Sequence, residues 1–422
     1  MQDALEQATK PVATRKQAEK RQKLLAQAAI QINSNGAGSI NLDAVAKAAG
    51  LSRNAIYYYV SDKSELAYLC LSATCDAIQE DLDEALAGFD DPALQISEFV
   101  RLNLIERSGR LAVLGDYDLL GGEQCSELLA KERKILDGLA GCVARGIASG
   151  RFRAVDPHLV ANCSIGMINW VRLAPRWLGE PLDDANGRRL ADAICELLLR
   201  GFAARDKLPT SHWPFVEQLT VTKVNPFDRG EAREQKRDQL LATASQLFNR
   251  RGIDGTSLND IVAELGATKG VFYHYFRDKT ELVVECYNRA FELYDTFVEA
   301  ARSYGTNGFE RALITNHLNC QAQLGSAPPL TLQTGLDALP ESVRSQFITR
   351  SQKIWLEVQR LFASGVDDGS CRAGDIRSMT EAAAGTFAWL ARGGLANSGK
   401  SAWELADAIC DVVGYGILID RN

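Results

Sequence analysis

Apolar residues recur every three or four positions over most of the chain. This spacing is typical of amphipathic helices, and it is clearest over residues 64–87, 127–149, 186–204, 279–302 and 341–364. The one stretch with β-like character, 219–224, is too short and isolated to form a sheet. The pattern therefore predicts an all-α protein.

The same pattern of apolar, polar and turn residues occurs twice in the chain. Residues 21–66 align with residues 237–282 without a gap, at an offset of 216 positions. Each copy begins with Leu-Leu-Ala, has a glycine at each of two turns, and ends on Tyr-x-Tyr followed by Asp-Lys-x-Glu-Leu. Solenoid repeats have periods of about 20–50 residues, so this is a duplicated domain.

The duplication extends toward the end of each half. A Leu-Ala-Asp-Ala-Ile-Cys segment at 190–195 recurs at 405–410, and a glycine and a tryptophan four apart recur as well: Gly166 and Trp170 against Gly385 and Trp389. The intervening stretches, 90–150 and 305–365, differ much more. Each half is therefore a small module followed by a helical domain of its own.

These observations divide the chain into five segments. We expect modules at 17–66 and 231–282, helical domains at 67–204 and 283–422, and a linker at 205–230. The linker contains Pro209, Pro214 and Pro226, and we expect its Trp213 and Phe215 to pack on a neighbouring domain as a tethered strap.

Each module has the helix signals of a helix-turn-helix. In the second copy, Gly252 ends a first helix, Ser257 caps a second that ends at Gly266, and Thr268 precedes a third over 269–275. In the first copy the corresponding helices are predicted at 42–49 and 53–59. The last helix of such a motif presents its N-terminal residues to base edges in the major groove.

The residues placed to contact DNA lie on and beside these recognition helices. Lys63 and Lys279 begin the helix that follows, where a positive side chain and free N–H groups attract phosphate. The candidates are Ser52, Arg53, Asn54, Tyr57, Tyr58 and Lys63 in the first copy and Thr256, Thr268, Lys269, Gly270, Tyr273, His274 and Lys279 in the second.

At these residues the chain resembles the TetR family of bacterial transcriptional repressors. The matching positions are Thr256, Ile261, Gly266, Gly270, Tyr273, Tyr275, Phe276, Lys279 and Leu282 in the second copy and Val45, Ala46, Ala49, Gly50, Leu51, Ser52, Tyr57, Tyr59, Lys63 and Leu66 in the first. The first copy departs from the family pattern with Ile40 for a capping Thr and Asn54 for Gly.

The resemblance implies a fold and a function. Family members act as homodimers, so two fused TetR-like units imply an intramolecular pseudo-dimer that reads an imperfect palindrome. The similar C-terminal stretches of the halves, 157–203 and 375–417, would form the dimer's four-helix bundle. The resemblance also implies a repressor released by a small-molecule effector, with the divergent middles as ligand domains and one effector per chain.

Charge separates the two modules. The chain has a net charge of −7, but residues 10–66 hold nine basic and four acidic residues, as expected of a nucleic-acid binder. Residues 229–282 hold nine basic and eight acidic residues. Either the second module binds DNA less tightly or its charges are sorted by face. A rival interpretation is that one module binds DNA and the other contacts a protein.

Candidate pocket residues are aromatic, thiol or imidazole side chains of the divergent domains. They are Tyr117, Cys163, Trp170 and Trp177 in the first half and His317, Cys320, Trp355, Phe387 and Trp389 in the second, and ordinary core positions are the alternative reading of each. Ten Cys without a CxxC pair predict free thiols in a reducing cytoplasm, with a redox role for Cys125 or Cys371 left open. The sequence predicts no enzyme, metal, cofactor or membrane span.

Overall fold

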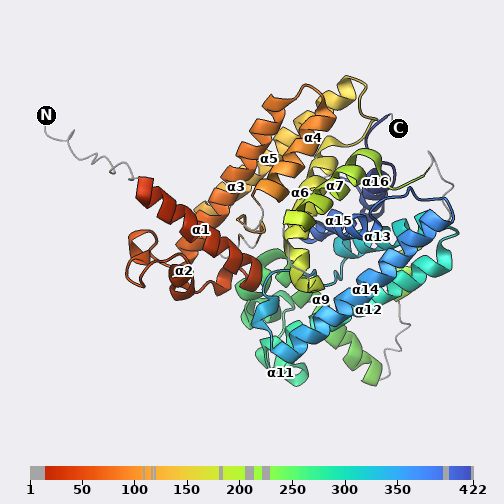
Figure 1. The fold of residues 1–422 in the computed structure, drawn as a ribbon. Coiled ribbons are helices and arrows are strands. Elements are labelled where there is room, and N and C mark those ends of the chain that lie inside the picture. Colours follow the sequence, from red (N-terminus) through yellow and green to blue (C-terminus); the bar gives the residue numbers. More distant parts are fainter. Residues whose placement is uncertain are drawn as a thin grey trace.

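The computed structural model describes residues 15–107, 110–115, 117, 120–179, 184–204, 213–220, 229–392 and 399–419. Within these ranges the chain is built from helices, and the only extended pairings are two isolated bridges (Figure 1). The predicted all-α class is confirmed. None of the described helices is both long enough and apolar enough to cross a membrane.

The two modules lie next to each other at one end of the molecule (Figure 1). Module 1 consists of α1 (Arg15–Asn35), the 3-10 turn η1 (Ala37–Ser39), α2 (Leu42–Ala48) and the 3-10 turn η2 (Ile56–Tyr58). Module 2 consists of α9 (Arg229–Gly255), α10 (Leu258–Glu264) and α11 (Lys269–Tyr275). At the end of the first helix, Gly36 and Gly252 have φ of 86° and 73°, a conformation that favours glycine.

A long helix carries each module into its helical domain. These helices, α3 (Lys63–Gly88) and α12 (Lys279–Tyr304), both have 26 residues. Asp62 and Asp278 cap them by accepting the N–H of Glu65 and Glu281 at 2.9 and 2.8 Å. The same cap at the same position gives the two halves the same helix start.

The remaining helices of the halves also correspond. Half one has α4 (Pro92–Arg101), the π-helical turn η3 (Leu102–Glu106), α5 (Gly122–Ala148), α6 (Pro157–Leu178) and α7 (Asp184–Arg200). Half two has α13 (Gly308–Leu324), η5 (Leu336–Ala338), α14 (Glu341–Asp367), α15 (Ile376–Ala388), η6 (Leu390–Arg392) and α16 (Ala402–Tyr415). Caps at Asp91 and Asn307, and at Asp156 and Asp375, fix the correspondence where the sequences diverge.

The halves meet along α6 and α15, which lie side by side in the middle of the molecule (Figure 1). A Cβ added to Gly166 would lie 2.4 Å from Trp389 Cδ1 and 2.5 Å from the Gly385 carbonyl oxygen. One added to Gly385 would lie 2.4 Å from Met167 Cα. Glycine is therefore required on both helices, which explains why the sequence repeats it at equivalent positions. With α7 and α16 these helices form the interface between the halves.

The tail of each half pairs with the other half. Ala203 forms an antiparallel bridge to Cys371, and Leu418 forms one to Phe152. An ion pair supports each tail, Arg372 to Glu196 at 2.6 Å and Arg153 to Asp411. These pairings are equivalent under exchange of the halves, so the contact is approximately twofold symmetric.

The part of the linker that the structure describes lies on half two. Trp213 packs against the His317 ring with centroids 4.7 Å apart, and Phe215 packs against Trp403 at 4.3 Å. The Val216 N–H donates to Gln321 Oε1 at 3.1 Å. This is the expected tethered strap. The suggested β-like stretch is wrong at its start, because Leu219 and Thr220 belong to the helix α8 (Val216–Thr220); residues 221–224 lie outside the described residues.

Candidate functional site

Module 2 presents a regular recognition helix. Thr268 is the N-cap of α11 and is itself exposed. The other exposed candidates lie on one side of the helix: Lys269, Gly270, Tyr273 and His274. Phe272 and Phe276 are buried beneath this face and hold the helix on the module core. The predicted capping box of α10 is present, with reciprocal bonds between Ser257 and Asp260.

Module 1 differs from prediction at the same place. The expected recognition helix over 53–59 is wrong: residues 53–55 form a turn and only the 3-10 segment η2 follows. The Ser52 hydroxyl accepts the Ala55 N–H at 3.2 Å, as an N-cap would, but Asn54 and three consecutive tyrosines have modest helix propensity. Ser52, Arg53, Asn54, Tyr57 and Tyr58 are nevertheless exposed, with Tyr58 at 90%.

A shallow surface groove gathers several of the module 1 candidates. Arg53, Tyr57 and Lys63 line it together with residues 38–43. Arg53 also lies 3.2 Å from Asp43, and Lys63 Nζ donates to the Gly38 carbonyl at 2.9 Å. Both positive groups are thereby held at the edge of the groove, where a phosphate would meet them.

Thr256 cannot contact DNA in this structure, contrary to expectation. Its side chain is fully buried, and its hydroxyl donates to the Gly252 carbonyl at 2.9 Å. The residue instead closes the loop between the first two helices of module 2. In module 1 the equivalent position is Ile40, also buried, so an apolar side chain fills the same place.

Lys279 faces the junction between the modules. It lines a small polar cavity there, with Asn35 to Gly38 of module 1 and Gly252 to Asp254 of module 2. Burial lowers its pKa, against the opposite effect of Asp254 and Asp260. Ser39 Oγ donates to Asp254 across this junction. The modules are thus in direct contact through the loops that follow their first helices.

Half two contains a cavity of about 130 Å³, measured as the space open to the centre of a water molecule. Three candidates from the sequence line it: Trp170, Trp355 and Phe387. Trp170, Leu178 and Phe202 reach it from half one, so both halves contribute to its wall. The other walls come from α12, α13, α14 and α15.

The remaining aromatic, thiol and imidazole candidates lie outside this cavity. Trp177 is buried against Tyr287 and donates to the Gln333 carbonyl at 3.1 Å, and Trp389 packs on Gly166. His317 lies 3.1 Å from Asp407, and burial lowers its pKa to about 4 although Asp407 acts to raise it. Tyr117, Cys163 and Cys320 are buried in the core.

The polar residues of the cavity were missed by sequence reasoning. Thr315, Asn316 and Asn319 face it from α13, and Ser351 from α14. The available signal was their helical spacing: Thr315, Asn316 and Asn319 lie on one face of a helix in which nearly every side chain is buried. Such a buried polar face is unusual, since unpaired polar groups cost about 1–3 kcal/mol each.

Helix α6 connects the cavity wall to the modules. Leu178 is at its C-terminus, and nearby Arg176 pairs with Asp337 at 2.6 Å and donates to Ser34 of α1. Gln352 of α14 donates to the Leu178 carbonyl at 2.7 Å. A shift of this helix end would therefore be felt both at the cavity and at module 1.

The described residues contain no cluster of His, Cys, Asp and Glu suited to a metal ion. All ten cysteines are free, and burial raises the pKa of Cys371 to about 12. A thiol so reluctant to ionise is a poor redox sensor, whereas Cys125 is partly exposed.

Comparison with known proteins identifies related sequences for both modules and one domain. The family described as bacterial regulatory proteins, tetR family, matches residues 24–68 and again residues 240–286. The family described as tetracyclin repressor-like, C-terminal domain, matches residues 93–202.

Individual relatives match short segments. The HTH-type transcriptional regulator YxaF of Bacillus subtilis, itself uncharacterized, is 47% identical over 55 residues, 13% of this chain and 29% of that protein. TtgR of Pseudomonas putida is 33% identical over 73 residues, 17% of this chain and 35% of that protein. The chain thus spans about a third of the length of these curated relatives.

Among solved structures, the TetR-family regulator PfmR of Thermus thermophilus is 22% identical. It aligns with 43% of this chain and 100% of its own, with a TM-score of 0.38.

Proposed function

Because the chain belongs to the tetR family of bacterial regulatory proteins, with the family's N-terminal module present twice, we propose that it is a sequence-specific DNA-binding transcriptional regulator. The observation that carries the proposal is the pair of modules, each exposing most of its candidate contact residues although Thr256 is buried, in one chain whose halves pack through equivalent contacts. The family is one of regulators rather than enzymes.

We propose that one chain binds an imperfect palindrome as a pseudo-dimer. The modules differ at exposed positions, Arg53 against Lys269, Asn54 against Gly270 and Tyr58 against His274. Unlike side chains prefer unlike base edges, so the two half-sites should differ in sequence. Because each half already packs on the other, the chain should sediment as a monomer in the absence of DNA.

Selection from random DNA followed by footprinting tests the proposal. We expect protection of two half-sites whose centres lie about 34–36 Å apart or a multiple of that distance. Arg53→Ala should relax base choice in one half-site and Lys269→Ala in the other, each at about 1–3 kcal/mol. No protected site for the purified full chain would refute DNA recognition.

A second candidate function uses one module for DNA and the other for a protein partner. The irregular recognition segment of module 1 favours it, because η2 supplies a single 3-10 turn where module 2 has a helix of seven residues. A footprint of one half-site, lost in Lys269→Ala and unchanged in Arg53→Ala, would select this alternative.

For regulation, we propose that the chain is a cytoplasmic repressor, and that a small effector bound in the cavity of half two releases it from DNA. The contacts of α6 with that cavity, with Ser34 and with Asp337 support this route. The effector must bind the released arrangement better than the DNA-bound one, typically by about 1–3 kcal/mol. Calorimetry would report one site per chain.

A further inference from the structure

The cavity of half two has no charged residue among the described residues that line it. Two arginines lie close by. Neither is part of the lining, and each stacks over an aromatic ring. Arg377 lies 5.3 Å from the Trp355 ring centre, and Arg350 lies 5.2 Å from that of Phe291. An ion that entered this space would lose its hydration, and no charged side chain of the lining would compensate for that loss.

Four residues of the lining carry buried polar atoms without a hydrogen-bond partner. These atoms are the indole Nε1 of Trp170 and of Trp355, Asn319 Oδ1 and Ser351 Oγ. Asn319 and Ser351 are each only 5% exposed. Unpaired buried atoms occur elsewhere in the described residues too, but these four belong to residues around one space, so a molecule in the cavity would give them partners.

For one of these atoms, Asn319 Oδ1, half one shows the hydrogen-bond partner that the protein itself can supply. Asn103 of half one corresponds to Asn319, since both lie 12 residues after the equivalent caps Asp91 and Asn307. Asn103 Oδ1 accepts a hydrogen bond from the buried guanidinium of Arg172 at 3.1 Å. The position equivalent to Arg172 is Ala391, so half two lacks this donor.

The charge that compensates Arg172 is missing from half two as well. In half one the buried Asp81 acts on the pKa of Arg172 by its negative charge, and it pairs with Arg107 at 2.6 Å. The position equivalent to Asp81, at the same distance from the start of the long helix, is Phe297. A cationic donor is therefore balanced in half one and would be unbalanced in half two.

From these observations we propose that the cavity of half two binds an uncharged, largely apolar compound. Its acceptor groups meet the indole N–H groups of Trp170 and Trp355, and a neutral donor, such as a hydroxyl, meets Asn319 in the place that Arg172 takes in half one. Because Trp170 comes from α6 of half one, the ligand touches both halves at once. The proposal deepens the function above by naming the chemical class of its effector.

Titration of the full chain with matched naphthalene probes tests this class. The probes are 1-naphthol, which is neutral, 1-naphthoate, which is an anion, and 1-naphthylmethylammonium, which is a cation, with binding followed by calorimetry and tryptophan fluorescence. We expect 1-naphthol to bind at least tenfold more tightly than either ion. Equal affinity of an ion and the neutral probe would overturn the proposal.

Variants locate the site and its polar contacts. Trp355→Phe keeps a ring but removes the N–H and part of the apolar contact, so it should weaken 1-naphthol about tenfold more than it weakens unsubstituted naphthalene. Trp403→Phe, outside the cavity, is the matched control and should affect neither. Ala312→Ile introduces the side chain that half one has at Ile96, and it should weaken every probe at least tenfold. Binding that survives Ala312→Ile lies elsewhere and contradicts the proposal.

The same preparations separate this proposal from the DNA-binding function. Footprinting without probe reports DNA recognition alone. A chain that footprints but does not prefer the neutral probe keeps its proposed function and loses the ligand class. A chain that prefers the neutral probe but protects no DNA keeps the ligand class and loses the function.

Discussion

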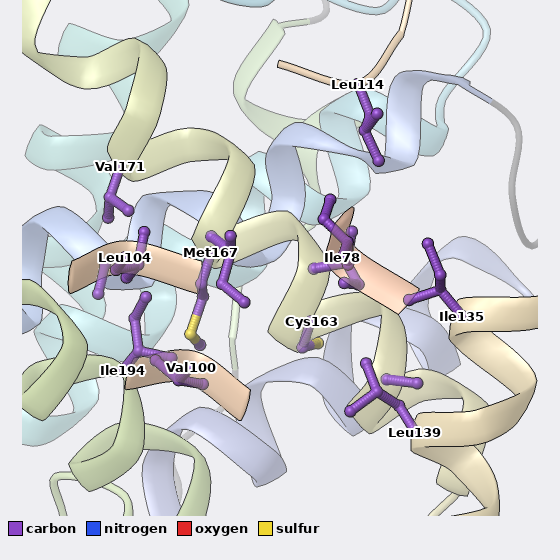
Figure 2. Close-up of a cluster of buried hydrophobic side chains, with 14 of the residues drawn as sticks. Ile78, Val100, Leu104, Leu114, Ile135, Leu139, Cys163, Met167, Val171 and Ile194 are labelled. Carbon is purple, nitrogen blue, oxygen red and sulfur yellow. The ribbon is translucent and has the colours of Figure 1, made fainter. Parts of the chain in front are cut away.

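Half one and half two place the same helices around different interiors. Three buried positions along α4 carry large apolar side chains, and the equivalent positions of α13 carry smaller or polar ones: Ile96, Phe99 and Val100 against Ala312, Thr315 and Asn316. Figure 2 shows the buried cluster of half one to which Val100 and Leu104 belong, with Met167 and Ile194 beside them and Ile78 farther along. Half two has its cavity at the corresponding place.

The comparison teaches that a few positions on one helix decide between a filled core and a binding cavity. The caps, the lengths of the long helices α3 and α12, and the central glycines are shared, so the scaffold tolerates either interior. Freed from the need to serve two identical copies, one half can specialise in packing and the other in binding. Each prediction below tests one part of that contrast.

The largest difference should come from truncating equivalent positions of α4 and α13. Phe99 is fully buried, so Phe99→Ala should lower the free energy of unfolding by about 3–5 kcal/mol through lost burial and a new cavity. Thr315 already borders a cavity, so Thr315→Ala should lower the free energy of unfolding by less than about 1 kcal/mol. Urea denaturation of the two variants measures this, and equal losses would mean that the two interiors are packed alike.

One pH effect should be specific to half two, because it comes from a histidine that half one lacks at the equivalent position. His317 has a pKa of about 4 in the folded chain and about 6.5 when unfolded, so unfolding takes up a proton between these values. Stability should therefore fall by up to about 3 kcal/mol as pH decreases from 6.5 to 4. The equivalent residue of half one, Arg101, stays charged throughout.

His317→Gln should flatten the stability profile in that interval relative to the unmodified chain. Denaturation at pH 7, 5.5 and 4.5 gives the comparison. A profile with the same slope in the variant would show that His317 is not the group that takes up the proton.

The contact shared by both halves should be sensitive to a single methyl group. In Gly385→Ala the added Cβ meets backbone atoms of α6, including Met167 Cα at 2.4 Å, and should cost about 2 kcal/mol by overpacking. Gly88→Ala is the control, because nothing lies within 4 Å of its Cβ position at the end of α3. An unchanged denaturation midpoint for Gly385→Ala would contradict the close approach of α6 and α15.

The smallest losses of stability should come from the ion pairs of the two tails, and they should be similar for the two halves. Arg153→Ala and Arg372→Ala each remove one of the equivalent ion pairs that hold the crossed tails. Both arginines are about a quarter exposed, so each loss should be about 1 kcal/mol or less. Arg153 also donates to the Gly416 carbonyl at 2.5 Å, which places its loss at the upper end. A marked inequality would show that the tails are not equivalent.

Much of the fold followed from the sequence because its signals are local or repeated. The Ser257 cap and the turn glycines Gly252 and Gly266 follow from local sequence signals, and the structure has them at a helix start and at positive φ. The repeat of Gly166 at Gly385 marks equivalent positions, which lie at the contact between the halves. The exposure of Lys269 and Tyr273 likewise followed from helical spacing around the buried Phe272.

The cavity could not be predicted, because it depends on which side chains meet across helices. Trp170 and Trp389 occupy equivalent positions, yet only Trp170 lines the cavity of the other half, while Trp389 fills the space above Gly166. Thr256 reads as an exposed loop residue, but its loop folds back onto α9. In module 1 the bond from the Ala55 N–H to the Ser52 hydroxyl is a helix-capping bond, yet the residues that follow have modest helix propensity and form only a 3-10 turn.

The crossed tails and the central glycine contact affect how the activity of the protein depends on the number of its copies in the cell. When a regulator that must first dimerise is scarce, the concentration of its active dimer falls as the square of the total protein concentration. In this chain the second half is always tethered to the first, so the partner's local concentration is fixed by the linker and not by expression. If the proposed function holds, operator occupancy should follow copy number in direct proportion down to a few molecules per cell.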